Sequence, residues 1–219
     1  MSNLQLLSDE EVEKRKAAEF GRQLRDAFEK TGFDARHVSL HNIGYVHPAD
    51  SRQMDWSRRL AMLIEKARVP GAIIALIGKR GTGKTQMACA CAYEISKARI
   101  MLGEGVSCMY SRTMDFFMRV KDSYSSDSSE ASSFASFLYP RLLVLDEVQV
   151  RNESRWEDNC LTYLLDRRYG ACKSTILISN QQADEFARSV GDSIMDRLGE
   201  TGLIIMCNWP SFRGSQLLP

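Results

Sequence analysis

The chain has 219 residues, of which 44% are hydrophobic, and 29 basic residues against 28 acidic ones give a formal net charge of +1. This composition suits one globular domain with an extension, and the near-neutral charge excludes nucleic-acid binding through a global positive field, so any such contact needs a local patch. No apolar run reaches membrane-spanning length, the polar start at 1–11 is unlike a secretion signal, and the six cysteines are scattered without a C-x-x-C pair. These features favour a cytoplasmic protein with no zinc module and no membrane contact.

Residues 1–32 are predicted to form an N-terminal amphipathic helix. Ser8 followed three residues later by Glu11 is typical of a capping box, and Gly32 is a typical helix stop. Apolar residues recur at near-helical spacing at Val12, Phe20, Leu24 and Phe28. This stripe is narrow and the remaining faces are charged, so the helix needs a partner surface. That surface could be its own domain or another protein.

The next segment, 33–54, has little periodicity and is predicted to be a linker. Residues 55–219 are predicted to form the main domain. This domain begins with an amphipathic helix at 56–67, which Pro70 and Gly71 separate from the apolar run 72–77. That run is typical of a buried strand.

The segment after this strand carries the first chemical signal. It consists of Gly78-Lys79-Arg80-Gly81-Thr82-Gly83-Lys84-Thr85, followed by Gln86 and small residues typical of a buried helix. Strand, glycine loop and helix in this order form the context of a phosphate-binding P-loop. Glycines let successive N–H groups turn toward phosphate oxygens, and the helix N-terminus adds a positive field. We predict that residues 78–86 bind a nucleoside triphosphate, with Lys84 at the β- and γ-phosphates and Thr85 on Mg²⁺.

A second strand is predicted at 106–110, and a helix from 111 through 120 follows it. The serine-rich stretch 123–136 is expected to be a mobile loop, either a plain connection or a functional insertion.

The second chemical signal is an apolar run, 142–145, that ends in Asp146 and Glu147. Ligands of doubly wound sheets bind at the carboxyl ends of the strands, where this acidic pair would lie. We predict that Asp146 holds Mg²⁺ through water and that Glu147 orients and deprotonates the attacking water.

The rest of the chain continues the alternation of helices and strands. Helices are predicted at 159–169 and 184–190, and strands at 175–179 and 203–207. Asn180 follows the first of these strands, where it could reach the γ-phosphate or simply begin a turn. Five buried strands separated by helices predict an α/β fold with a five-stranded parallel sheet and helices on both faces.

These motifs, in this order, resemble the AAA+ P-loop ATPases, and among them the DnaC-type helicase loaders and the related IstB-type transposition ATPases. The resemblance covers about residues 60–215 and includes Met195-Asp196-Arg197-Leu198 and Asn208-Trp209-Pro210-Ser211-Phe212-Arg213. It implies that Asn180 is sensor 1, that Arg197 is an arginine finger for the nucleotide of a neighbouring subunit, and that Arg213 senses the γ-phosphate. From the residues alone, either arginine could be a solvated charge, and Asp196 could pair with Arg197.

An arginine finger that acts between subunits implies a homo-oligomeric ring or spiral. The resemblance also implies single-stranded DNA contacts at Tyr124, Ser154 and Trp156, with phosphate contacts from Lys121, Arg151 and Arg155. Base stacking on aromatic rings tolerates any sequence. Trp156 could equally pack on the helix that follows it.

The sequence departs from the AAA+ pattern at three places. Arg80 stands where proline is common, few residues follow Arg213 where a helical lid domain would be, and the N-terminal part is short with no zinc module. The predicted function is ATP-dependent loading of a replicative helicase onto single-stranded DNA, with residues 1–32 as the candidate docking element for the helicase.

Two alternatives stay open. One is an IstB-like transposition accessory ATPase that binds double-stranded DNA and a transposase. The other is a small-molecule kinase, which would need an arginine-rich lid where residues 111–140 carry serine instead.

Overall fold

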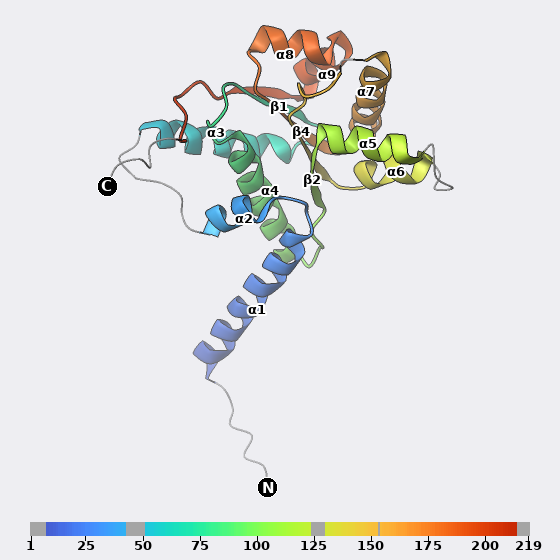
Figure 1. The fold of residues 1–219 in the computed structure, drawn as a ribbon. Helices are drawn as coiled ribbons and strands as arrows, with labels where there is room; N and C mark the ends of the chain where they lie inside the picture. The colour runs from blue at the N-terminus through green and yellow to red at the C-terminus, as the bar shows by residue number, and fades with distance from the viewer. Residues whose placement is uncertain (1–7, 43–50, 124–129, 153, 214–219) are drawn as a thin grey trace.

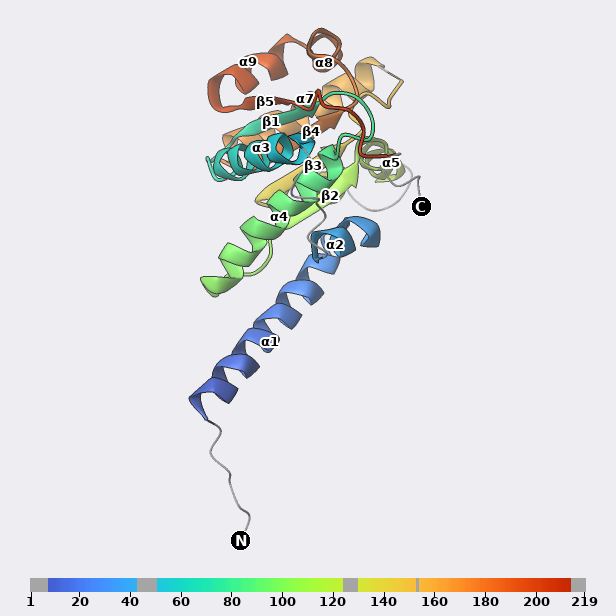
Figure 2. The same ribbon diagram turned by 90° about the vertical axis from the view of Figure 1, so that its left-hand side faces the viewer.

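The computed structural model describes residues 8–42, 51–123, 130–152 and 154–213, which form one parallel sheet between two layers of helices (Figures 1 and 2). The helices are α1 (Asp9–Glu29), α2 (Ala35–Asn42), α3 (Ser51–Ala67), α4 (Lys84–Met101), α5 (Thr113–Ser123), α6 (Glu130–Leu138), α7 (Arg155–Gly170), α8 (Ala183–Val190) and α9 (Asp192–Thr201). The strands are β1 (Ile73–Ile77), β2 (Cys108–Arg112), β3 (Leu142–Asp146), β4 (Ser174–Ser179) and β5 (Leu203–Met206). Among the described residues, no helix combines the length and apolarity needed to cross a membrane.

The sheet has the order β2-β3-β4-β1-β5, and all neighbouring strands are parallel. Every residue of β1, β3 and β4 is buried, which explains their continuous apolar sequences. The predicted five-stranded parallel sheet is confirmed. Because β4 lies between β1 and β3, the glycine loop after β1 and the acidic pair after β3 lie on either side of the end of β4.

Two hydrophobic clusters fill the two faces of the sheet, as alternate residues of β1 show. Ile74 and Leu76 belong to the cluster under α3 and α4, whereas Ile73, Ala75 and Ile77 belong to the cluster under α5 to α9. The predicted helical layers on both faces are therefore present.

The N-terminal helix α1 begins with the predicted capping box. The Ser8 hydroxyl accepts a hydrogen bond from the Glu11 amide at 3.3 Å, and the Glu11 carboxylate accepts one from the Ser8 amide at 2.8 Å. Near its C-terminal end, Leu24 and Phe28 are buried, and Phe28 joins the cluster around α4. The other end of α1 extends away from the domain (Figures 1 and 2). One end of this helix thus packs on its own domain.

The helical content is higher than predicted at four places in the described part of the chain. Residues 35–42, within the expected linker, form α2, and α3 and α7 begin earlier than predicted, at Ser51 and Arg155. Part of the expected serine-rich loop forms α6, because Phe134 and Phe137 are buried against Phe116, with ring centroids 5.6 Å and 4.9 Å apart. Residues 124–129 of that stretch lie outside the described residues.

Candidate nucleotide-binding site

The glycine loop connects β1 to α4 in the conformation that only glycine permits easily. Gly78 has a φ of 130° and Gly81 a φ of 81°. A Cβ atom on Gly78 would lie 2.5 Å from the Cys207 carbonyl oxygen, and one on Gly81 would lie 2.0 Å from the Ser211 hydroxyl oxygen. The loop is therefore packed tightly against the segment that follows β5, and glycine is required at both positions.

Lys84, the first residue of α4, is buried and anchored across the loop. Its ammonium group donates hydrogen bonds to the carbonyl oxygens of Gly78 and Lys79, at 2.7 Å and 2.8 Å. Burial lowers the pKa of Lys84, and the nearby Asp146 carboxylate acts in the opposite direction. The lysine thus lies inside the loop, where a phosphate chain would meet its ammonium group.

Thr85 and Asp146 meet although they are far apart in the sequence. The Thr85 hydroxyl donates a hydrogen bond to Asp146 Oδ2 at 2.8 Å, and Asp146 Oδ1 accepts one from the Glu147 amide at 2.7 Å. A hydroxyl and a carboxylate are the oxygen donors that Mg²⁺ takes beside nucleotide phosphates. Together with the glycine loop and Lys84, this donor set fits Mg²⁺ and a nucleoside triphosphate.

Glu147 and Asn180 follow adjacent strands at the same edge of the sheet. Glu147 has a φ of 57°, which is uncommon for a residue other than glycine, and Val148 donates to the Ile178 carbonyl oxygen. The Asn180 amide donates to Gln149 Oε1 at 3.2 Å. These bonds hold the ends of β3 and β4 together beside the loop.

The remaining predicted loop residues have different surroundings. Lys79 and Arg80 are exposed, and the buried Thr82 hydroxyl donates to the Lys79 carbonyl oxygen at 3.0 Å. The Gln86 side chain interacts with His37, through its amide group to the His37 carbonyl oxygen and through its oxygen to the ring, both at 3.1 Å. In this structure Gln86 connects α4 to α2.

Three donors outside the loop hold three successive loop carbonyl groups, and none of them was predicted to do so. The Phe212 amide donates to Gly81, the Trp209 indole to Thr82 and the Trp56 indole to Gly83, at 2.8, 3.0 and 3.2 Å. Because a trans peptide unit points its N–H away from its C=O, these bonds direct the following N–H groups to the opposite side of the loop. Arg213 lies in the same segment, with its Cγ 3.4 Å from where a Cβ on Gly81 would be.

Arg197 lies on α9, with its side chain 26% exposed. Its guanidinium donates to the Ser193 carbonyl oxygen at 2.7 Å and forms an ion pair with Asp166 of α7 at 3.0 Å. The pairing partner is therefore Asp166, where the sequence had suggested Asp196. The side chain is at the surface rather than in the core.

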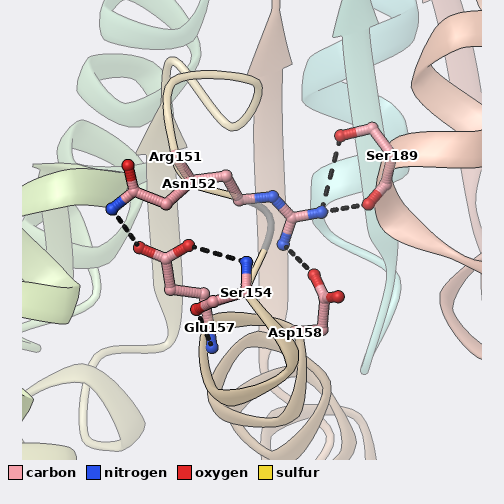
Figure 3. Close-up of polar contacts among 6 residues, drawn as sticks. All are labelled: Arg151, Asn152, Ser154, Glu157, Asp158 and Ser189. Carbon is pink, nitrogen blue, oxygen red and sulfur yellow. Dashed lines mark hydrogen bonds and ion pairs between the residues drawn. The ribbon is translucent and has the colours of Figure 1, made fainter.

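The predicted DNA contacts are only partly described. Tyr124 lies outside the described residues. The Ser154 hydroxyl accepts a hydrogen bond from the Glu157 amide at 3.3 Å and caps α7 (Figure 3). Trp156 is half-buried, with its ring 5.9 Å from that of Phe117 and the Lys121 ammonium 5.8 Å from its centre. Trp156 thus belongs to α7 itself, and its ring lies beside Phe117 of α5 rather than on a helix that follows it.

The prediction that Arg151 contacts DNA phosphates is wrong. Its side chain is 1% exposed and pairs with Asp158 at 3.0 Å. It also donates to the Ser189 carbonyl oxygen, so the guanidinium lies between α7 and α8 (Figure 3). Because the Arg151 guanidinium is buried and already paired, it is not available to bind a DNA phosphate.

Comparison with known proteins places this site in a family. The family model for IstB-like ATP binding proteins matches residues 1–216. The replicative helicase loader DnaC of Escherichia coli strain K12 is 32% identical over 194 residues, which are 87% of this chain and 76% of that protein.

Two solved structures share the fold at lower identity. A crystal structure of the DnaC helicase loader has a TM-score of 0.64 at 20% identity and covers 79% of this chain and 99% of that chain. The replication initiator DnaA bound to AMPPCP and single-stranded DNA has a TM-score of 0.55 at 22% identity and covers 67% of this chain and 43% of that chain. With its P-loop, its five-stranded parallel sheet and these relatives, the chain belongs to the IstB-like ATP-binding protein family and has the AAA+ fold.

Proposed function

We propose that this chain is an ATPase that loads a replicative helicase onto single-stranded DNA. The observation that carries the proposal is the contact between Thr85 and Asp146, which joins the glycine loop to the acidic pair in one nucleotide site. The relatives support the rest: DnaC, the 32% identical protein, is a replicative helicase loader.

The residues of the site have complementary roles in hydrolysis. Lys84 stabilises charge on the β- and γ-phosphates, and Thr85 with Asp146 would hold Mg²⁺, which would offset negative charge on the phosphates. Glu147 orients the attacking water and accepts its proton. Asn180 and Arg213 contact the γ-phosphate, so the site responds to whether ATP or ADP is bound.

Arg197 completes the site of a neighbouring subunit in this proposal. A guanidinium binds phosphate oxygens in a bidentate manner and spreads the charge of the transition state. A side chain that serves the next subunit needs a head-to-tail arrangement, so the chain forms a homo-oligomeric ring or spiral. Arg197 must then exchange its contacts with Asp166 and Ser193 for contacts with the nucleotide.

The DNA and the helicase bind at different parts of the molecule in this proposal. Tyr124, Ser154 and Trp156 face single-stranded DNA, with the exposed Lys121 and Arg155 beside them. The helix in residues 1–32 docks onto the helicase with the end that extends from the domain, while 33–54 connects it to the ATPase domain at 55–219. ATP binding favours the form that grips DNA and helicase, and hydrolysis releases it.

A loading assay tests this function. Hexameric replicative helicases are incubated with the protein, ATP and circular single-stranded DNA, and the helicase retained on DNA is measured. We expect the protein to increase retention, and we expect Lys84→Ala to abolish the increase. Failure to bind any replicative helicase, with DnaC and its own helicase as positive control, contradicts the proposal.

A transposition accessory ATPase is the second candidate, and the description of the matching family as IstB-like favours it. Such a protein would prefer double-stranded DNA. Affinities for single-stranded and double-stranded DNA of the same length, measured at one salt concentration, separate the two candidates. Preference for the duplex supports the second candidate.

A further inference from the structure

The carboxylate of Asp146 has a hydrogen-bond partner that belongs to neither the glycine loop nor the acidic pair. The hydroxyl of Tyr110, on the neighbouring strand β2, donates to Asp146 Oδ2 at 3.0 Å. This is the same oxygen that accepts the Thr85 hydroxyl. Tyr110 is 9% exposed, so its hydroxyl is sheltered from solvent. Two donors from different elements thus fix the orientation of the carboxylate.

The same tyrosine is fixed from its other side by the end of α1 and the residues that follow it. We call residues 24–33 the arm. The Tyr110 amide donates to the Thr31 carbonyl oxygen at 2.7 Å, and its ring stacks on Phe33 with centroids 4.6 Å apart. Phe33 in turn stacks on Phe28 at 5.8 Å. An unbroken row of rings therefore runs from the end of α1 to the partner of Asp146.

The backbone approach at this point is also very close. Gly32 has a φ of 92°, and a Cβ atom there would lie 2.6 Å from the Tyr110 carbonyl oxygen. The arm is thus seated directly against β2, and a shift of the arm would displace Tyr110.

The hydroxyl of Tyr110 is held where it can donate to Asp146, because the ring is buried and its backbone is hydrogen-bonded to the arm. Groups that hydrogen-bond a metal ligand orient it and tune its metal affinity.

We propose that Tyr110 is a positioning residue that orients Asp146 for Mg²⁺ and couples the arm to the nucleotide site. Contact between α1 and a partner protein then alters Mg²⁺-dependent nucleotide binding, and Mg²⁺ with nucleotide alters the arm by the same free energy. This inference rests on the proposed ATP site, and it specifies how the docking helix would communicate with it.

The first test removes only the hydroxyl. In Tyr110→Phe, we expect the Mg²⁺ concentration for half-maximal binding of a fluorescent ATP analogue to rise about tenfold. Binding of the analogue without Mg²⁺ and the thermal midpoint should stay close to those of the unaltered chain, which a merely structural role would not predict. Tyr163→Phe, at an exposed tyrosine on α7, is the matched control. An unchanged Mg²⁺ requirement in Tyr110→Phe overturns the positioning role.

The second test perturbs the arm at a distance from the metal site. Phe33→Leu keeps an apolar side chain but removes the ring that stacks on Tyr110, and Phe134→Leu is a control at a residue with the same exposure, 6%, under the other face of the sheet. We expect a raised Mg²⁺ requirement in Phe33→Leu alone. Equal requirements in the two variants overturn the coupling.

Hydrogen exchange gives the reciprocal measurement. In the unaltered chain, Mg²⁺ with AMPPCP should slow exchange of the Tyr110 amide and of the arm by at least about fivefold. Tyr110→Phe should lose that slowing. If the exchange rates of the Tyr110 amide and the arm are the same with and without Mg²⁺ and AMPPCP in the unaltered chain, the coupling is contradicted.

These measurements involve no helicase or DNA. A chain that shows the Mg²⁺ shift but loads no helicase keeps the inference and loses the proposed function. A chain that loads helicase without the Mg²⁺ shift keeps the proposed function and loses the inference. A chain that binds no nucleotide in the presence of Mg²⁺ overturns both.

Discussion

Glu147 is held in an unusual backbone conformation directly beside Asp146, the carboxylate proposed to hold Mg²⁺. Its φ of 57° costs on the order of 1–3 kcal/mol for a residue other than glycine. The hydrogen bond from its amide to Asp146 Oδ1 offsets part of that cost. Conformations of this kind persist where the surrounding structure fixes them, which favours a role in the chemistry for the Glu147 side chain.

Glu147→Gln is expected to separate hydrolysis from binding. The amide keeps the shape of the side chain but cannot accept a proton from water, so the turnover number should fall by about 100-fold or more. Phosphate release gives the rate, and titration with a fluorescent ATP analogue should give an affinity within about twofold of the unaltered chain. Full activity in the variant contradicts the assignment of Glu147 as the base.

Arg168 is a buried charge with a structural role, in contrast to the charged residues of the candidate site. It is fully buried at the end of α7, where its guanidinium donates to the Thr175 hydroxyl and to the carbonyl oxygens of Phe137, Pro140 and Ser174, at 2.6 to 2.9 Å. These acceptors belong to α6, β4 and the connection between α6 and β3. Arg168 thus stabilises the end of the domain that lies opposite the candidate nucleotide site.

Arg168→Met should leave those acceptors unsatisfied and lower the free energy of unfolding by about 3–5 kcal/mol. Arg167→Met, at the exposed neighbouring residue, is the control and should change it by less than about 0.5 kcal/mol. Urea denaturation monitored by circular dichroism measures both. A loss below 1 kcal/mol in Arg168→Met would contradict this structural role.

At the scale of elements, the glycine loop is supported by α3 and by residues 208–213. Each contributes an indole donor to a loop carbonyl group, and Arg52 of α3 also donates to the Ser211 carbonyl oxygen at 3.0 Å. Elements from both ends of the domain thus fix one side of the loop, which leaves its amides on the other side preorganised for an anion.

Trp56→Phe should weaken nucleotide binding about fivefold, because it removes one hydrogen bond to the loop while the ring remains. Trp156→Phe is the matched control, since that indole lies on α7 beside Phe117 of α5. Isothermal titration with ATP and Mg²⁺ measures both affinities. Identical affinities in the two variants contradict a supporting role for Trp56.

The sequence predicted the strands and the loop better than the helices around them. Continuous apolar runs and the glycine motif are local signals, so β1, β3 and β4 lie within one residue of their predicted bounds. The helix α6 was missed because serine obscures its pattern, and it is held by Phe134 and Phe137 through contacts with α5. Tertiary packing decided the structure there.

The candidate site shows the same division. Lys84, Thr85 and Asp146 were found from motifs and meet in the structure. Tyr110 and Trp56 were missed as site residues because nothing in their local sequence indicates what they contact. The register of β2 beside β3 could have indicated Tyr110, since Arg112 pairs with Asp146 and the tyrosine side chain two residues earlier points to the same face. Arg151 was misassigned because its burial depends on α8.

For the whole molecule, the decisive question is whether the nucleotide site is shared between copies. Arg197 is partly exposed on α9 and contacts Asp166 of its own chain. In a head-to-tail assembly the same surface would face the glycine loop of the next copy.

Mixing two inactive variants tests this arrangement. Lys84→Ala cannot bind ATP productively, and Arg197→Ala cannot serve its neighbour, so each alone should hydrolyse little ATP. An equimolar mixture should recover about one quarter of the activity of the unaltered chain, because one interface in four then combines an intact loop with an intact arginine. A mixture with no more activity than the separate variants indicates that each site works within one chain.

Helix α7 supplies the ion-pair partners of two arginines that the sequence analysis singled out, Arg151 and Arg197. Asp158 near its start holds Arg151, and Asp166, two turns further along, holds Arg197 (Figure 3 shows the first pair). These carboxylates are about 12 Å apart along the helix axis. A displacement of the start of α7 would therefore move both carboxylates together and disturb both ion pairs. DNA contact at the start of α7 and release of Arg197 toward a neighbouring subunit would then be mechanically linked through one helix.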